Sequence, residues 1–409
     1  MRKLIIIGAG ASGMAAGIAA RRNNVDTLIL EKNERAGKKL LITGNGSCNL
    51  TNLNAAKTRY FGQHAGFVKP VFKEYDSRRI MEFFEELGIS CVEKSEGKIF
   101  PRSLQASSVL DVLREELQRL NCDFISNAPV VSVRRWKKGF EVITADGQEL
   151  TSENLIIAAG GKSAPNTGSS GDGFELAKSL GHHIIKPLPS LAPAKLDDDC
   201  LKGTQGVRFT GKLSLIDETG KSLFEDTGDV LFTDYGVSGP VVMDLSAYLA
   251  PREDKKLKSL IRINFVPDIE KEEIIQILKK RAAARPEKTA EAFLNGFINK
   301  RLIPFVLKKS GLIEKKKLPV KNLAEKELLK IAAVLHASDL NVKGVMGYKN
   351  SAATLGGVDT AEIDPLTMKS KLVNGLYFAG EVIDIMGRCG GYNLQFAWAS
   401  GLIAGESIK

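Results

Sequence analysis

The sequence predicts an α/β fold that is interrupted by an inserted antiparallel β domain and a small helical subdomain. Three observations support this prediction. First, an apolar strand pattern at the N-terminus runs into a glycine-rich turn and a helix. Second, two later apolar strands end in small residues near positions 160 and 380. Third, the apolar residues of 193–338 recur first at the spacing of strands and then at the spacing of helices. A length of 409 residues also indicates more than one domain, because single hydrophobic cores of this size are unusual.

The composition is that of a folded globular protein, with 43% hydrophobic and 26% charged residues. The net charge of +10 is unevenly distributed: residues 251–330 hold 21 Lys/Arg against 11 Asp/Glu, and the rest of the chain carries 37 of each. Lysine-rich faces of amphipathic helices are usually just solvated. We therefore expect no nucleic-acid partner, and an anionic partner of this segment is the alternative.

The five cysteines lie far apart and form no Cys-x-x-Cys pair. This spacing suits neither a zinc site nor a disulfide framework, so we expect reduced thiols and a cytoplasmic protein. The apolar run after Met1 is broken by Gly8 and is too short for a signal peptide. We also expect no membrane partner, because no stretch approaches the roughly 20 apolar residues of a membrane span.

The N-terminal segment contains a complete dinucleotide-binding pattern. Gly8 permits a tight turn, Gly10 lets the backbone approach a diphosphate, and Gly13 lets the helix pack on the strand. Glu31 is placed to accept hydrogen bonds from ribose hydroxyls. The pattern consists of a strand, the GAGASG turn, a helix and a second strand at residues 4–7, 8–13, 14–23 and 27–30.

Two later segments distinguish FAD from NAD as the dinucleotide. NLIIAAGG at 154–161 and NGLYFAGE at 374–381 are short strands that run into small residues, and the second ends in a carboxylate. Both are similar to strands of glutathione-reductase-type FAD proteins, so a Rossmann-like FAD-binding domain is predicted. No second strand–GxGxxG–helix unit follows, so NAD(P)H is expected at most as a transient electron donor.

Three further glycine-rich segments are candidates for the site. Residues 37–52 offer close backbone approach and neutral donors to a phosphate or a flavin edge, with a plain surface loop as the alternative. Residues 387–395 open a helix whose amides would face the pyrimidine end of a flavin, with simple helix capping as the alternative. Residues 231–240 either line a substrate pocket or form a structural turn.

These motifs resemble the aminoacetone-oxidase-type FAD-binding flavoproteins, a bacterial family that includes 3-dehydro-bile acid reductases. The resemblance spans nearly the full chain and includes FPRS at 100–103 and GSSGDG at 168–173. Two departures bear on substrate charge: the family usually has Arg in place of Ser47 and His in place of Asp234. The resemblance implies FAD contacts at Gly8, Gly10, Ala11, Ser12, Glu31, Lys39, Asn45, Val130, Glu381, Asn393 and Leu394.

Neighbouring positions in the same motifs complete the predicted cofactor site, with no metal site and no assigned catalytic residue. They are Gly13, Lys32, Gly46, Asn49, Ala159, Gly160, Gly380, Gly391 and Tyr392. Tyr392 is either a packing residue or a proton donor. Cys48 and Cys389 are interpreted as structural thiols.

The predicted domains are an interrupted cofactor domain and an insertion. The cofactor domain covers 1–192 and 339–409, the β-rich insertion covers 193–269, and the helical subdomain covers 270–338. The function predicted is FAD-dependent hydride transfer with a small organic substrate, either reducing an activated C=C bond or oxidising an amine. An RNA-modifying flavoprotein that uses the basic insert, or a flavin-binding regulatory protein without turnover, is the alternative. The oligomeric state is not predicted.

Overall fold

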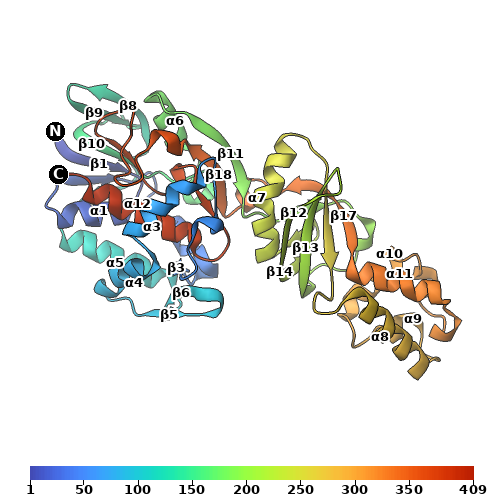
Figure 1. Cartoon of the computed structure of the whole chain (residues 1–409). Helices are drawn as coiled ribbons and strands as arrows, with labels where there is room; N and C mark the ends of the chain where they lie inside the picture. Colours follow the sequence, from blue (N-terminus) through green and yellow to red (C-terminus); the bar gives the residue numbers. More distant parts are fainter. The chain divides into compact units, whose positions relative to one another are not determined.

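The computed structural model describes residues 1–409 except for the side chain of Lys57. The chain forms two compact units: unit 1 is Met1–Pro189 with Tyr348–Lys409, and unit 2 is Ser190–Gly347. Figure 1 labels their helices and strands. The predicted α/β fold with an inserted antiparallel β domain is confirmed.

The central sheet of unit 1 joins all the strands that the sequence predicts for the cofactor domain. Its order is β7-β2-β1-β10-β9-β8, with β19 paired to β10. The strands β2, β1, β10 and β19 are parallel, which places Ile6 opposite Ile29 and Ile156. The residues of these strands that end nearest the carboxyl edge are apolar, as in LIII at 4–7 and LII at 155–157, which suits a parallel sheet covered on both faces. The bounds are β1 Arg2–Ile7, β2 Thr27–Leu30, β7 Asp123–Ile125, β8 Val130–Trp136, β9 Gly139–Thr144, β10 Glu149–Ile157 and β19 Leu376–Phe378.

Two small-residue helices pack closely in unit 1. These are α1 (Ala11–Arg22) and α12 (Tyr392–Glu406), which lie together in Figure 1. A Cβ on Gly401 would lie 2.4 Å from the carbonyl oxygen of Ser12. Glycine at this position therefore sets how closely the first and last helices of the chain approach each other.

Smaller elements surround the sheet of unit 1, and a strand pair connects it to the insertion. The chain leaves unit 1 at the end of β11 and re-enters it at Tyr348, shortly before β18. The strands β11 and β18 pair with each other. The bounds are α2 Lys38–Leu41, β3 Thr51–Asn52, β4 Tyr60–Phe61, α3 Val68–Glu74, α4 Ser77–Glu86, β5 Cys91–Glu93, β6 Lys98–Pro101, α5 Ala106–Arg119, α6 Asp172–Ser179, β11 Ile184–Ser190, β18 Ala353–Val358 and β20 Met386–Gly387.

Unit 2 is a closed antiparallel barrel, and its helices α8, α9, α10 and α11 gather at one end, as Figure 1 shows. Its order is β12-β15-β14-β13-β16-β17. The rings of Phe209 and Phe265 stack with their centroids 5.2 Å apart, and the ring centroid of Phe305 in α10 lies 5.4 Å from that of Phe265. The barrel and the helices therefore share one core. The bounds are β12 Ala194–Leu196, β13 Arg208–Asp217, β14 Ser222–Phe232, β15 Gly236–Ser238, α7 Pro240–Asp254, β16 Ser259–Asn264, α8 Lys271–Ala284, α9 Ala290–Phe293, α10 Ile303–Lys309, α11 Glu325–His336 and β17 Ser338–Val345.

The unit boundaries differ by a few residues from the predicted ones. The strand β17 lies almost entirely in the segment assigned to the cofactor domain (339–409), yet it pairs with β16 and β12 and closes the barrel. Its sequence alone does not reveal this, because strand partners far apart in the chain are a tertiary property. The division of the insertion at 269/270 stays a prediction, since unit 2 is one compact body.

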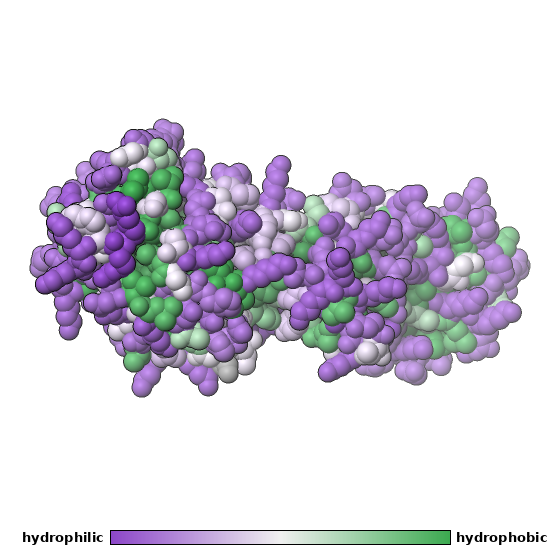
Figure 2. Space-filling view, turned by 90° about the horizontal axis from the view of Figure 1, so that it is seen from above, coloured by the Kyte–Doolittle hydropathy of each residue, from purple (hydrophilic) through white to green (hydrophobic). Residues whose placement is uncertain are grey.

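The face of the molecule in Figure 2 is mostly hydrophilic. Figure 2 shows one face of the molecule, on which hydrophobic residues form a band on unit 1 between hydrophilic neighbours. In the described part of the chain, none of the helices combines the length and apolar content that a membrane crossing requires.

Candidate functional site

A large hollow lies in unit 1 where the parallel strands end. It reaches the last residues of β1 and β2, Ile7 and Leu30, and Ala158 just after β10. Ligands of open α/β sheets bind at the carboxyl ends of the strands, so this is the place where a cofactor is expected. Its rim comes from residues 8–12, 31–43, 159–172, 352–353 and 381–397.

The glycine-rich turn at 8–13 brings the backbone into this hollow. Gly8 has a φ of +103°, and a Cβ there would lie 2.6 Å from the carbonyl oxygen of Ala158. A Cβ on Gly13 would lie 1.9 Å from the carbonyl oxygen of Gly8, so the helix packs directly on the turn. A Cβ on Gly10 would meet no atom within 4 Å, which leaves room for a ligand. The helix α1 begins at Ala11, so the backbone N–H groups of its first turn can donate hydrogen bonds to an anionic group of a ligand in the hollow.

Glu31 is buried at the end of β2 and held by three N–H groups. One carboxylate oxygen accepts the backbone N–H of Ala9 at 2.9 Å. The other accepts the backbone and side-chain N–H groups of Asn33 at 2.9 and 2.7 Å. Oε1 already accepts two hydrogen bonds and Oε2 accepts one. The carboxylate is therefore fixed in place, and Oε2 keeps the capacity to accept a hydroxyl of a ligand.

A second carboxylate, Glu381, lines the hollow from the segment after β19. It accepts the backbone N–H of Thr354 at 2.8 Å, and its other oxygen pairs with Lys39 Nζ at 2.5 Å. Lys39 and Glu381 are 25% and 19% exposed, so the pair is partly shielded from water. This pair joins the helix α2 to the C-terminal segment across the hollow.

The N-terminal end of α12 closes the same hollow. Asn393 and Leu394 line it. The side-chain oxygen of Asn393 accepts the backbone N–H of Gly387 at 2.9 Å, and its amide nitrogen donates to the carbonyl oxygen of Gly387 at 2.7 Å. Gly391 precedes the helix with a φ of +97°, and a Cβ there would lie 2.7 Å from the carbonyl oxygen of Thr51. The backbone amides of this end lie at the positive pole of the helix, where they favour negative charge on a ligand.

Thirteen of the twenty residues predicted for the cofactor site line this one hollow, although their contacts with a cofactor stay a prediction. They come from five separate segments of the chain, which the fold brings together. They are Gly8, Gly10, Ala11, Ser12, Glu31, Lys32, Lys39, Val130, Ala159, Gly160, Glu381, Asn393 and Leu394.

The other seven predicted residues lie outside the lining. Asn45 and Gly46 are exposed in the turn after α2, and Asn49 is buried behind it. The remaining four pack the walls: Gly13 on Gly8, Gly380 against Ser12, Gly391 on Thr51, and Tyr392 with its ring 6.0 Å from that of Tyr60.

The two cysteines of the glycine-rich motifs differ in what the structure shows of them. Cys48 is buried, and burial raises the pKa of its thiol to about 12. A thiol with such a pKa stays protonated near neutral pH and is not a nucleophile, in accord with a structural role. Cys389 is partly buried and unoxidised.

The structure also reveals lining residues that sequence reasoning missed. Ser169 lines the hollow, is 6% exposed, and its hydroxyl has no hydrogen-bond partner among the described residues. Ala352 and Ala353 reach the hollow from the start of β18. The glycine-rich GSSGDG stretch was the available signal for Ser169; the alanines carry none. A buried unpartnered hydroxyl, an open Gly10 and two helix ends with unpaired amides fit a dinucleotide with an anionic diphosphate.

Several known proteins are similar to this chain. The chain matches the family described as HI0933-like protein Rossmann domain over residues 2–407. It is 37% identical to a 3-dehydro-bile acid delta(4,6)-reductase of Clostridium scindens, covering 100% of this chain and 99% of that protein. It is 31% identical to a ribosomal RNA dihydrouridine synthase of Escherichia coli, covering 99% and 97%. Among solved structures, a flavocytochrome c3 fumarate reductase gives a TM-score of 0.48 at 16% identity, covering 99% of this chain and 78% of that one.

Proposed function

Because this chain belongs to the HI0933-like Rossmann family and is an FAD-dependent oxidoreductase, we propose that it reduces a C=C bond conjugated to a carbonyl group. The observation that carries this proposal is the full-length similarity to two relatives with one chemistry in common. The names delta(4,6)-reductase and dihydrouridine synthase both describe hydrogen added across such a bond. Amine oxidation, the other reaction predicted from the sequence, has no such support.

In this proposal the lining of the hollow binds FAD, which supplies a hydride when it is reduced. The amides of Gly10 and Ala11 bind the diphosphate, and Glu31 accepts hydrogen bonds from the adenosine ribose. Glu381, held by Lys39, accepts hydrogen bonds from the hydroxyls of the ribityl chain. The first-turn amides of α12 stabilise negative charge on the flavin ring.

We propose NAD(P)H as a transient electron donor. The chain has one GxGxxG motif, and it lines the hollow assigned here to FAD. A donor would therefore bind only while it reduces the flavin and then leave the site to the substrate. Five widely spaced cysteines with no Cys-x-x-Cys pair are consistent with activity in the cytoplasm, where thiols stay reduced.

Anaerobic half-reactions test the proposal. The FAD-loaded protein is reduced with NADH or NADPH and then mixed, without oxygen, with a 3-oxo-Δ4 steroid, and flavin absorbance and product mass are followed. We expect reoxidation of the flavin and a product that has gained two hydrogens. The saturated 3-oxo steroid is the matched control and should leave the flavin reduced. Reoxidation by oxygen alone, with amines but not NAD(P)H reducing the flavin, would establish an oxidase instead.

A second candidate substrate is a uracil of ribosomal RNA, whose C5=C6 bond is also conjugated to a carbonyl group. Besides the name of one relative, the basic segment of unit 2 favours it. Several of its cations are used internally: Arg301 and Lys308 bind backbone carbonyls of residues 199–205, and Lys309 pairs with Asp198. Other exposed lysines make no ion pair among the described residues and are available to phosphates: Lys300, Lys316, Lys317, Lys321, Lys326 and Lys330.

RNA binding separates the two substrates. Replacing Lys316, Lys317 and Lys321 by glutamine should weaken binding of a ribosomal RNA fragment and lower the slope of log K against log salt by about 2. The matched control replaces three exposed lysines of unit 1, namely Lys69, Lys73 and Lys94. Equal effects of both triple variants, or no RNA binding by the wild type, would leave a small conjugated ketone as the substrate.

A further inference from the structure

The turn at residues 167–172, here called the strap, crosses the rim of the cofactor hollow between β10 and α6. Thr167, Gly168, Ser169 and Asp172 all line the hollow. Gly168 has a φ of +105°, and a Cβ there would lie 2.4 Å from Asn33 Nδ2. The strap therefore lies directly against the residues that follow β2 and has a shape that requires glycine.

Two side chains that follow Glu31 hold the strap. Lys32 Nζ pairs with Asp172 Oδ2 at 2.5 Å and donates to the hydroxyl of Ser170. Asn33 Nδ2 donates to the carbonyl oxygen of Thr167 at 3.2 Å and also to Glu31 at 2.7 Å. Both ends of the strap are thus tied to the same short segment, about 140 residues earlier in the sequence.

One polar group of the strap is left without a partner. The hydroxyl of Ser169 is buried, lines the hollow and makes no hydrogen bond among the described residues. Gly160 lies next to it, and a Cβ on Gly160 would lie 3.0 Å from that hydroxyl oxygen. A buried hydroxyl without a partner costs free energy, so such groups are usually satisfied by water or by a ligand.

We propose that the strap closes over the adenosine half of bound FAD and that the Ser169 hydroxyl hydrogen-bonds to that half, so that the strap sets how long the cofactor is retained. The adenosine half is assigned because the ties come from Lys32 and Asn33, which directly follow the ribose-binding Glu31. The flavin half lies toward Glu381 and α12. The proposal concerns cofactor retention and holds whatever the substrate is.

Ser169→Ala tests the direct contact. We expect the dissociation constant of FAD, measured by quenching of flavin fluorescence, to rise about 5- to 15-fold, the effect of one lost hydrogen bond. The unfolding midpoint of the FAD-free protein should not fall, because the hydroxyl has no partner there. The matched control is Ser179→Ala, whose hydroxyl bonds within its own helix to Leu176. An unchanged FAD dissociation constant would overturn the contact.

Asp172→Asn tests the tie without removing a buried group. We expect FAD to dissociate about 2- to 5-fold faster. The variant weakens the exposed ion pair of residue 172 with Lys32, while the hydrogen bonds of Lys32 to Ser170 and of Asn33 to Thr167 remain. The control is Glu175→Gln, which removes a charge from the same end of α6 but has no basic partner among the described residues. An equal rise of the FAD dissociation rate in both variants would show an effect of charge at the end of α6 and would overturn the proposed role of the strap.

FMN, which lacks the adenosine half, distinguishes the two ends of the site. Ser169→Ala and Asp172→Asn should leave the dissociation constant of FMN at its wild-type value while weakening FAD. Equal weakening of FMN would place the strap at the flavin and overturn the assignment. All of these readouts are made without turnover, so they stand whether or not the protein reduces a C=C bond.

Discussion

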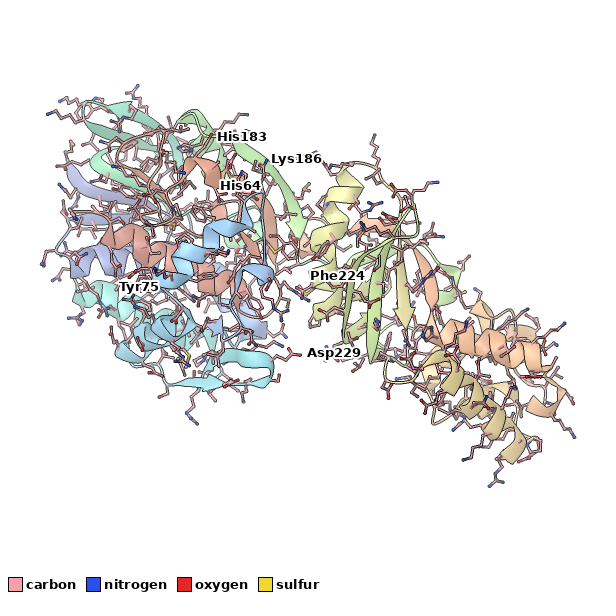
Figure 3. All side chains as sticks on the ribbon, in the orientation of Figure 1. His64, Tyr75, His183, Lys186, Phe224 and Asp229 are labelled. Atoms are coloured by element: carbon pink, nitrogen blue, oxygen red, sulfur yellow. The ribbon has the colours of Figure 1, made fainter. Side chains whose placement is uncertain are left out.

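Single buried titratable residues behind the cofactor hollow make its wall sensitive to pH. Asp384 is 1% exposed, accepts the backbone N–H of Gln63 at 2.7 Å, and precedes Ile385, which lines the hollow. Burial, with the nearby Asp359 carboxylate adding to it, raises the pKa of Asp384 from 3.8 to about 6. Figure 3 labels His64 and His183, the exposed imidazoles that lie 4.0 and 3.5 Å from Asp359.

The first prediction concerns Asp384→Asn. Because the folded carboxyl binds its proton more tightly than the unfolded one, the wild type loses stability as the pH rises from about 4 to 6. The variant lacks this loss and keeps an acceptor for Gln63. Its unfolding free energy relative to wild type should therefore increase from pH 4 to pH 7, by at most about 3 kcal/mol. Urea titrations at both pH values measure this, and an advantage that shrinks with rising pH would contradict it.

His182 has the opposite pH dependence. Its ring lies between Glu362 and Ser370, at 2.9 Å from each, and burial lowers its pKa although Glu362 opposes this. The Ser370 hydroxyl oxygen already accepts two backbone N–H groups, so its hydrogen points to Nε2 and the neutral ring donates from Nδ1. Protonating this ring in the folded state is therefore unfavourable.

A second prediction follows for Glu362→Gln. A lowered folded pKa means that stability is lost as the pH falls below about 6.5, the ordinary histidine value. Removing the Glu362 charge removes the influence that raises the pKa, so the variant should lose more unfolding free energy between pH 7 and pH 5 than the wild type. Denaturant titrations at the two pH values decide this. A smaller loss than wild type would show that Glu362 does not support the charged ring.

At the scale of elements, the local sequence predicts the main strands of unit 1 but not the contacts between segments that lie far apart in the chain. The strand predicted at 27–30 matches β2, and the strands near 154 and 376 are found as β10 and β19. These elements carry continuous apolar runs, which determine structure locally. The place of β17 in the barrel, the alanines at the start of β18 and the partnerless hydroxyl of Ser169 depend on contacts between distant segments. A single sequence does not encode such contacts in any short pattern.

The third prediction concerns the contact of α1 with α12. Gly401 faces the carbonyl oxygen of Ser12, and a side chain there would force the helices apart. Gly401→Val should lower the unfolding free energy by about 1–3 kcal/mol, the usual cost of overpacking, and should weaken FAD binding because both helices begin at the hollow. Thermal unfolding with and without FAD measures both effects. Gly347→Ala, where a Cβ meets no atom within 4 Å, is the control and should be close to neutral.

At the scale of the whole molecule, the cofactor hollow is lined by unit 1 alone. The excess positive charge lies in the other unit, on the segment that follows β15 and α7. In the proposals made above, FAD binding and RNA binding therefore belong to different parts of the chain. The chain passes from unit 1 to unit 2 after β11 and back shortly before β18, and these two strands pair with each other.

The last prediction separates these two assignments. A variant in which residues 190–347 are replaced by a short Gly/Ser linker should fold and bind FAD with a dissociation constant within about tenfold of the full chain, since compact units with their own core often fold alone. It should lose any binding to ribosomal RNA, because the unpaired lysines of 300–330 are gone. Flavin fluorescence and RNA filter binding at several salt concentrations measure the two properties. RNA binding retained by this variant would place the anionic partner on unit 1, and loss of FAD from a folded variant would show that unit 2 contributes to the cofactor site.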